Sequence, residues 1–320
     1  MIKPLVDFRS RLSNQERAVL DSTHLITSAI RGFALTMPIP AHSSPARSSR
    51  TGLPSTLTLI SRLSCRRAGT RFNARGIDDD GNVANFVETE TVFWSPSGVC
   101  FSYVQLRGSV PVFWEQAPGL LPAQQKVQLT RSPQATQPAF DKHFEDLELK
   151  YGPIHIVNLL SMDKLAEVEL SARYQGHVSR CSLNHPQEGD SREHGFLKET
   201  NYDFHAETRE RGYEAAKLIS HYIHDSADAF GYCLMERIED HPSGAQMMDE
   251  KDIVRSVMIL QQQGAFRTNC LDCLDRTNLV QTIISNMAIE AWLAPRGERP
   301  NSDLFARHGT LWADNGDVNF

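Results

Sequence analysis

The stretch Arg267-Thr-Asn-Cys-Leu-Asp-Cys-Leu-Asp-Arg-Thr-Asn278 decides how this chain is interpreted. It places an arginine, Arg276, six positions after a cysteine, Cys270, and a threonine directly after the arginine. The five residues between them can turn their backbone N–H groups inward and hold phosphate oxygens. Arg276 can add two parallel hydrogen bonds to the same group. The spacing therefore suits a thiolate that attacks a bound phosphate and becomes phosphorylated.

The flanks of this stretch predict a strand, a loop and a helix. Residues 264–269 can form a short buried strand, and residues 279–293 carry apolar side chains at helical spacing until Pro295. Such a loop presents its anion to a helix N-terminus, where unpaired N–H groups and the helix dipole favour negative charge. The same field favours the thiolate form of a cysteine in the loop.

A second segment of the same spacing shows how weak the bare pattern is. With 6 Cys and 25 Arg in 320 residues, chance gives roughly 0.5 Cys-x5-Arg pairs. Cys65-Arg-Arg-Ala-Gly-Thr-Arg71 is such a pair, but the residues after it offer no amphipathic helix. We therefore expect Cys65 to be a small residue in a strand and Cys270 to be the nucleophile.

Four blocks of sequence, in order, resemble the motifs of one family. Beside the stretch quoted above they are residues 67–90, residues 104–116 (Val-Gln-Leu-Arg-Gly-Ser-Val-Pro-Val-Phe-Trp-Glu-Gln) and residues 312–317 (Trp-Ala-Asp-Asn-Gly-Asp). From about Leu53 onward the chain resembles the Sac family of phosphoinositide phosphatases, and within it the Sac domains of synaptojanin-like proteins. Family members extend further at both ends, so the chain is expected to be truncated at both ends.

The resemblance implies a substrate, whereas the spacing does not. It implies removal of a monoester phosphate from phosphatidylinositol phosphates, with the 4-phosphate and 3-phosphate as leading targets and the 3,5-bisphosphate as a further one. The reaction passes through a cysteinyl phosphate that water hydrolyses, and it requires no metal and no cofactor. Three alternatives stay open: a protein phosphatase with the same loop chemistry, an inactive lipid-binding fragment, and a Cys-x2-Cys redox protein.

Residue types suggest the role of each position in the loop. Cys270 is the expected nucleophile, and Arg276 binds the transferring group. Asp272 is favoured over Asp275 as the acid that protonates the departing oxygen, because a carboxyl beside a phosphate holds its proton more tightly. Asp275 would then support the loop. Further candidates for the acid are Asp314 and Asp317, and the phosphate-binding residues are Leu271, Cys273, Leu274, Asp275 and Thr277.

Three positions have two interpretations each. The hydroxyl of Thr277 can stabilise the thiolate or cap the helix. Cys270 and Cys273 can form a reversible disulfide, or Cys273 can simply pack; zinc is not expected, since no second Cys-x2-Cys is visible. The third is a basic cluster, which binds substrate phosphate or the membrane, or else forms a solvated surface beside acidic residues 78–80. Its members are Arg66, Arg67, Arg71 and Arg75.

Composition limits the compartment and the partners. A net charge of −6 argues against global attraction to anionic lipid or nucleic acid. The six cysteines lack regular spacing, no signal peptide begins the chain, and no apolar run reaches a membrane span of about 18 residues. We expect a cytoplasmic protein with peripheral membrane association, whose partners are phosphoinositide lipids and trafficking proteins. The oligomeric state is not predicted.

The order of elements predicts an α/β fold (α+β overall) in three parts. Residues 1–56 form a partial N-terminal segment with a Pro/Ser-rich loop, residues 57–131 a β-rich part, and residues 136–320 a catalytic sheet flanked by helices. Strands are expected at 154–160, 202–205 and 230–235, and a hairpin at 91–106. Helices are expected at 140–151, 165–178, 213–223 and 252–262, the last directly before the quoted stretch.

Overall fold

The fold is described from a computed structural model that covers residues 8–23, 31–45, 52–67, 74–118, 125–184, 197–239, 254–298 and 301–318. Its strands are β1 Gly32–Ile39, β2 Ser55–Leu63, β3 Val87–Trp94, β4 Val99–Arg107, β5 Trp114–Pro118, β6 Gln125–Leu129, β7 Ile154–Asn158, β8 Leu197–Asn201, β9 Cys233–Glu239, β10 Val254–Leu260 and β11 Ala265–Asn269. Its α-helices are α2 Asn14–Ser22, α3 Pro133–Tyr151, α4 Leu165–Val178, α5 Phe204–Arg211, α6 Ile219–Phe230, α7 Asp275–Leu293 and α8 Ser302–Val318. Short 3-10 turns lie at η2 Ser182–Asn184, η3 Tyr213–Leu218 and η4 Ala294–Arg296.

One mixed sheet organises the described residues. Its strands run in the order β1-β2-β3-β4-β11-β7-β8, and the β9–β10 hairpin attaches to β4. The first four strands are antiparallel neighbours, whereas β11, β7 and β8 are parallel. The predicted α/β fold class is therefore confirmed, with a β-rich part and a parallel part joined in a single sheet.

The antiparallel part follows from alternating sequence. Along β2, Leu57 and Leu59 are buried while Thr58 and Ile60 are only partly covered, as expected where one face of a strand meets the core. The predicted hairpin joins β3 to β4, and Gly98 adopts a φ of 90° in its turn, where the N–H of Gly98 donates to Ser95 O. Strand β1 pairs along its whole length with β2.

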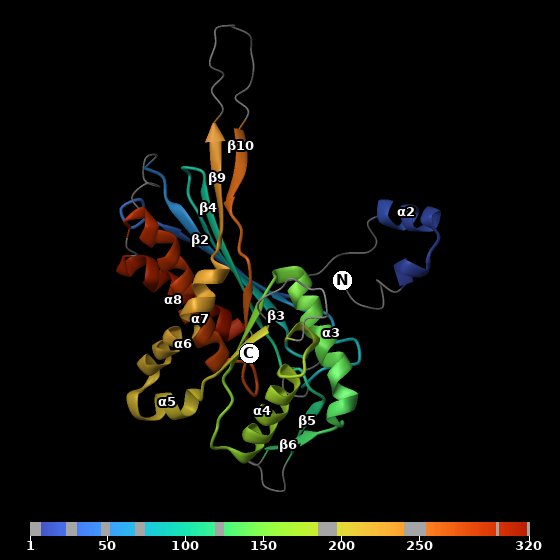
Figure 1. Cartoon of the computed structure of the whole chain (residues 1–320). Helices are drawn as coiled ribbons and strands as arrows, with labels where there is room; N and C mark the ends of the chain where they lie inside the picture. The colour runs from blue at the N-terminus through green and yellow to red at the C-terminus, as the bar shows by residue number, and fades with distance from the viewer. Residues whose placement is uncertain are drawn as a thin grey trace.

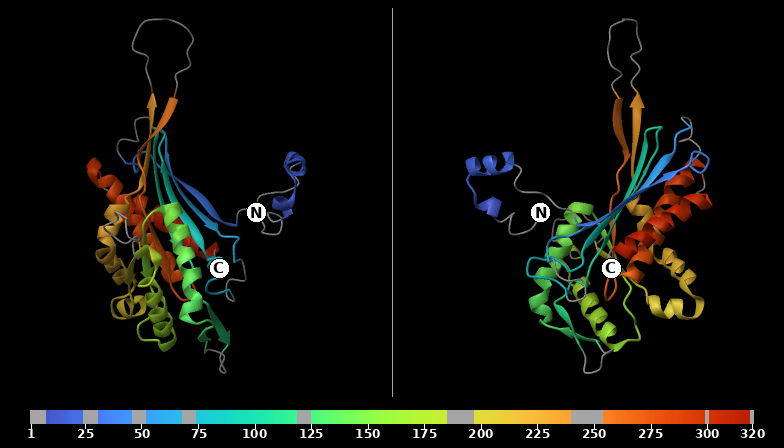
Figure 2. Two further views of the ribbon diagram at one scale, coloured as in Figure 1. Left: turned by 45° about the vertical axis from the view of Figure 1, so that its right-hand side comes forward. Right: turned by 180° about the vertical axis from the view of Figure 1, so that it is seen from behind.

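The parallel part positions the loop that follows β11. Every residue of β7 and β11 is buried, because helices cover both faces of this part of the sheet. Helices α6, α7 and α8 lie on one side of the sheet, and α3 and α4 on the other (Figures 1 and 2). Two apolar cores result, one between the sheet and α6–α8 and one between the sheet and α3 and α4.

Two predicted elements are wrong in type. Residues 252–262, expected as a helix, contain β10, which pairs antiparallel with β9. The β-branched residues of this segment suit the hairpin partner that the fold provides, and this pairing overrides the apparent helical spacing. Residues 202–205, expected as a strand, lie after β8, and Phe204 begins α5. Asp203 caps that helix by accepting the N–H of Ala206 at 2.9 Å.

Several boundaries also differ from the prediction. The strand expected at 230–235 starts only at Cys233, because Phe230 ends α6. Helix α3 begins at Pro133 behind the capping Ser132, so the helix starts about two turns before the predicted residue 140. By contrast, α4 spans the predicted residues 165–178. No helix among the described residues is long and apolar enough to span a membrane.

Candidate active site

The loop between β11 and α7 folds around the sulfur of Cys270. Cys270 Sγ accepts the N–H of Cys273 at 3.0 Å and the O–H of Thr277 at 3.1 Å. Cys273 has a φ of 61°, a left-handed conformation that turns its N–H back toward the sulfur. Cys270, Cys273 and Thr277 are all buried. The predicted strand, loop and helix are thus present, and the sulfur of Cys270 lies at the helix N-terminus.

The carboxylate of Asp272 contacts the sulfur of Cys270, a backbone N–H of the loop and Arg276. Its Oδ1 accepts the thiol hydrogen of Cys270 at 3.0 Å and the N–H of Leu274 at 3.2 Å, and it lies 3.7 Å from Arg276 Nη2. A carboxylate oxygen therefore takes the kinds of donor that a phosphate oxygen would take in the same loop. Cys270 itself is fully buried, whereas the Asp272 side chain that contacts its sulfur is 40% exposed.

Opposing influences act on the Cys270 thiol. Burial is the largest and raises its pKa, and the neighbouring Cys273 and Asp272 act in the same direction, whereas Arg276 lowers it. The pKa of the Cys273 thiol is lowered to about 7, first by its hydrogen bond with Cys270. Cys270 Sγ receives both an N–H and an O–H, and these two donors stabilise a thiolate on Cys270 once its proton has left. Both cysteines are free thiols.

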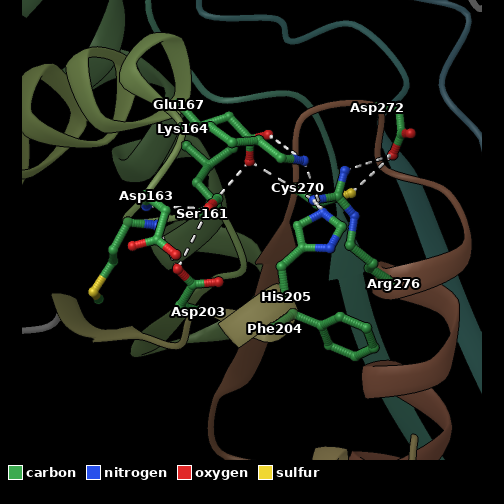
Figure 3. A network of polar contacts seen from close by, with 12 residues as sticks. Ser161, Asp163, Lys164, Glu167, Asp203, Phe204, His205, Cys270, Asp272 and Arg276 are labelled. Atoms are coloured by element: carbon green, nitrogen blue, oxygen red, sulfur yellow. Dashed lines mark hydrogen bonds and ion pairs between the residues drawn. The ribbon is translucent and has the colours of Figure 1, made fainter. Parts of the chain in front are cut away.

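Arg276 lies beside the loop and contacts residues of two other segments. Its Nη1 donates to His205 Nε2 at 3.1 Å and lies 3.7 Å from Glu167 Oε2 (Figure 3). Its side chain is 14% exposed. The pKa of the guanidinium is raised overall; burial opposes the charge, while the Cys270 and Asp272 side chains favour it. The arginine is therefore fixed with one edge toward the loop and one toward Glu167.

A buried carboxylate, Glu167, organises the segment after β7. Its Oε2 accepts the N–H of Ser161 at 2.8 Å, and its Oε1 lies 3.4 Å from Lys164 Nζ. Asp203 fixes the same segment by accepting the N–H of Met162 at 2.6 Å. The segment that follows β7 is thereby tied to the start of α5, next to the loop that follows β11 (Figure 3).

Lys164, Glu167 and His205 were not singled out from the sequence. The signal that could have found them is topological: the carboxyl ends of neighbouring parallel strands meet at one edge of a sheet, where ligands bind. Lys164 and Glu167 follow β7, which lies next to β11, and His205 follows β8, the next strand of the sheet beyond β7. His205 in particular was expected in a strand, and its actual place is the first turn of α5.

A cavity of about 830 Å³ opens beside the loop. It is lined by Lys164, Phe204, His205, Thr208, Asp272, Asp275, Arg276 and Leu279. Nitrogen atoms of Lys164 and Arg276 both reach His205 Nε2, at 3.2 and 3.1 Å, so one wall of the cavity is cationic. The pKa of His205 is lowered by burial first and then by these two charges. This wall suits an anionic ligand larger than phosphate alone.

The structure separates the candidate acids. Asp272 and Asp275 both line the cavity, and Asp275 stands exposed in the first turn of α7. Asp314 and Asp317 lie on α8 and are not among the lining residues. The block at 312–317 instead supports α7: Asn278 donates to Trp312 O at 2.7 Å, and Asn315 donates to Asn278 Oδ1 at 2.9 Å.

The basic cluster has other surroundings. Arg75 is buried and donates to Gln116, and Arg67 donates to the carbonyl of Arg75 at 2.6 Å. Arg66 lines a separate cavity of about 200 Å³ with Lys150 and Tyr151 among others. None of these three arginines is among the residues that line the cavity beside the loop, and Arg71 lies outside the described residues. Cys65 is exposed in a turn after β2, so its predicted place in a strand is wrong.

No group of three or more His, Cys, Asp or Glu side chains that could hold a metal ion occurs within the described ranges.

Comparison with known proteins gives one family and a consistent set of relatives. The sequence profile of the SacI homology domain matches residues 1–209. The polyphosphatidylinositol phosphatase INP53 of Saccharomyces cerevisiae is 41% identical over 99% of this chain and 26% of its own length. The inositol-1,4,5-trisphosphate 5-phosphatase 1 of Schizosaccharomyces pombe is also 41% identical, with the same coverage of 99% and 26%.

Human synaptojanin-1 is 39% identical over 81% of this chain and 15% of its own length. The chain thus spans about a quarter of the length of the yeast relatives and less of synaptojanin-1. The similarity also includes residues before Leu53, where no motif was recognised. The phosphate loop lies after the profile match and inside the region shared with the yeast relatives.

Proposed function

Because the chain belongs to the SacI homology domain family, we propose that it is a phosphoinositide phosphatase that acts through a cysteinyl-phosphate intermediate. Its targets are monoester phosphates on phosphatidylinositol phosphates, the 4-phosphate and 3-phosphate first. The observation that carries the proposal is the Cys270 sulfur, which receives a backbone N–H and the Thr277 hydroxyl beside Asp272 and Arg276. The name of the Saccharomyces cerevisiae relative, a polyphosphatidylinositol phosphatase, supports the lipid substrate.

In the first step one proton moves from Cys270 to Asp272, which prepares the nucleophile and the acid together. The thiol of Cys270 already donates to Asp272 Oδ1, so transfer of this proton leaves a thiolate on Cys270 and a neutral carboxyl on Asp272. Entry of the substrate phosphate favours the transfer, because its charge repels a carboxylate and not a carboxylic acid. The phosphate oxygens then replace the Asp272 carboxylate as acceptors of the hydrogen bonds from the loop N–H groups and Arg276.

The second step transfers the phosphoryl group. The thiolate attacks phosphorus, an S–P bond forms, and the P–O bond to the ring breaks as Asp272 gives its proton to the departing oxygen. Arg276 and the loop N–H groups stabilise the charge on the equatorial oxygens. In the third step water attacks phosphorus while the Asp272 carboxylate accepts a proton. The S–P bond breaks, and Thr277 donates to the leaving thiolate.

The cationic wall binds the remainder of the head group. Lys164 and His205 stand beside Arg276 in the same cavity, so a second anionic group of the lipid can lie against them while the scissile phosphate occupies the loop. The substrate is a lipid, and the enzyme accordingly acts at the surface of a cytoplasmic membrane with peripheral association. Trafficking proteins are the proposed partners there.

The test is phosphate release from a panel of short-chain phosphoinositides, with phosphopeptides as the competing substrate class. We expect turnover of monophosphorylated lipids at the 4- and 3-positions and none by Cys270→Ser. Rapid acid quenching of labelled substrate should leave phosphate on Cys270, read by mass spectrometry. Turnover of phosphopeptides in preference to lipids, or label on another residue, contradicts the proposal.

A further inference from the structure

Arg267 is a charged residue at the base of the loop that the proposed reaction does not use. It lies on β11, three residues before Cys270, and it is fully buried. Its Nη1 donates to Asn269 Oδ1 at 3.1 Å and to the hydroxyl of Tyr174 at 3.4 Å, and its Nη2 donates to the carbonyl of Ser109. Its Nε is buried with no hydrogen-bond partner.

All three partners of Arg267 are neutral. Throughout the described part of the chain, no carboxylate lies within 4.0 Å of its guanidinium, whereas Arg276 has both Glu167 and Asp272. A buried cation without an anionic partner is costly, and proteins usually supply an opposite charge. An anion held by the neighbouring loop can supply the opposite charge.

The surrounding ionisable groups do not supply that charge. Tyr174 of α4 and His143 of α3 are buried, and burial raises the pKa of the tyrosine and lowers that of the histidine to about 3, so both are neutral. Burial raises the pKa of Glu199 on β8 to about 7, and this carboxyl, whose charge raises the pKa of Tyr174, makes no ion pair with Arg267 in the described structure. On the loop side, the charge of Arg267 is one of the causes that lower the pKa of Cys273.

The position of Arg267 is fixed by two of the blocks that resemble the family motifs, residues 67–90 and 104–116. Ser109, whose carbonyl it binds, accepts the N–H of Gly76 on its Oγ at 2.9 Å, and its own N–H donates to Ala84 O at 2.9 Å. The blocks at 67–90 and 104–116 thus meet behind β11 and hold the guanidinium in place.

We propose that Arg267 is the buried counter-charge of the phosphate loop, so that its partner is the anion which the loop carries: the Cys270 thiolate and then the bound phosphate. This inference rests on the proposed function and adds a residue to it. Arg267 touches neither the thiol nor the substrate and acts through the loop, so it is a positioning residue. Arg276 binds the phosphate from the side of the cavity, whereas Arg267 stabilises negative charge in the loop from the buried side.

The test is the pH dependence of alkylation of Cys270 by iodoacetamide, read at each cysteine by mass spectrometry, with exposed Cys65 as the internal reference. Arg267→Met removes the charge and should raise the pKa of Cys270 by about one unit or more. It should also weaken protection of Cys270 by inorganic phosphate by about tenfold or more. Tyr174→Phe removes one hydrogen bond and keeps the charge, so it should leave both quantities within about twofold.

Arg267→Lys separates the charge from the hydrogen bonds and decides the matter if Arg267→Met does not fold. Lysine keeps the charge and loses the contacts with Ser109 and Asn269. The proposal predicts that the alkylation profile stays near that of the wild type; a profile shifted as in a neutral variant would show a purely hydrogen-bonding role and overturn it. Folded Arg267→Met with an unchanged profile overturns it as well.

The same measurements distinguish this inference from the proposed function. If phosphate fails to protect Cys270 even in the wild-type protein, the loop does not bind phosphate and the proposed function fails. If phosphate protects both the wild-type protein and Arg267→Met equally, the loop works as proposed and only the role of Arg267 is lost.

Discussion

Two segments of this chain have the spacing Cys-x5-Arg, and the fold gives their cysteines different surroundings. Cys270 follows a fully buried strand and precedes the 19-residue helix α7. Cys65 follows β2, an antiparallel strand that pairs with β1. Cys65 is exposed in a turn. The spacing alone is therefore uninformative. A helix N-terminus, burial and inward donors convert a cysteine and an arginine into a site for phosphate chemistry.

The largest difference between the two segments should be in turnover. Cys270→Ser replaces a nucleophile with a hydroxyl of far higher pKa and should lower kcat by about 10⁴-fold or more. Cys65→Ser changes an exposed side chain and should leave kcat within about twofold. Both are measured as phosphate release from a short-chain phosphatidylinositol 4-phosphate. Comparable losses in the two variants would show that the assignment of the nucleophile is wrong.

The arginines that end the two segments, Arg276 and Arg71, give the next test of the comparison. Arg276→Lys keeps the charge but loses the planar pair of donors, so kcat should fall by about 100-fold or more. The matched change in the other segment, Arg71→Lys, should leave kcat unchanged. A mild effect at Arg276 would mean that its ion pairs with Glu167 and Asp272 matter more than its contact with the transferring group.

Asp272 has no counterpart in the other segment and should give two opposite effects. Asp272→Ala removes the proposed acid, and kcat should fall by about 100-fold. The Asp272 carboxylate raises the pKa of Cys270, so removing it lowers that pKa and shifts alkylation of Cys270 to lower pH. Alkylation at pH 7 should therefore become faster while turnover becomes slower. If the rates of alkylation and of turnover both fall, Asp272 stabilises the fold of the loop and is not the acid of the reaction.

The sequence was informative where local signals and tertiary structure agree. The order of strand, loop and helix at 264–293 was predictable because burial, loop spacing and helical periodicity point the same way there. Residues 252–262 were mistaken because a short apolar segment fits either period, and only the pairing of β10 with β9 decides it.

The candidate site was only partly predictable for a related reason. The loop residues are contiguous and carry their own signature, whereas Lys164, Glu167 and His205 come from two other segments. Their meeting depends on the parallel order β11-β7-β8, which is a property of the sheet and not of any local pattern. The charge of Arg267 was likewise visible in the sequence, but its burial without a carboxylate was not.

Lys164 tests the cationic wall and should have a smaller effect. Lys164→Gln should raise KM for a short-chain phosphoinositide about tenfold and leave KM for p-nitrophenyl phosphate nearly unchanged, because that substrate has no second anionic group. Lys142→Gln, in α3 and away from the residues that line the cavity, is the control, since its side chain is 51% exposed and pairs with exposed Asp80. An equal rise for both substrates would place Lys164 at the scissile phosphate.

The smallest expected effect concerns the residue after each arginine, which is Thr277 in the phosphate loop and Phe72 in the other segment. The Thr277 hydroxyl donates to Cys270 Sγ at 3.1 Å inside the core, so Thr277→Val keeps the shape and removes one donor. One hydrogen bond to a charged sulfur contributes about 1.5 kcal/mol, which corresponds to about a tenfold loss in rate. The loss should fall on breakdown of the phosphoenzyme, where the thiolate leaves, so a burst of product should precede a slower steady state. Thr277→Ser restores the hydroxyl and should restore breakdown. A Val variant that loses stability but shows no burst, or a Ser variant that fails to recover, would assign Thr277 to packing at the start of α7.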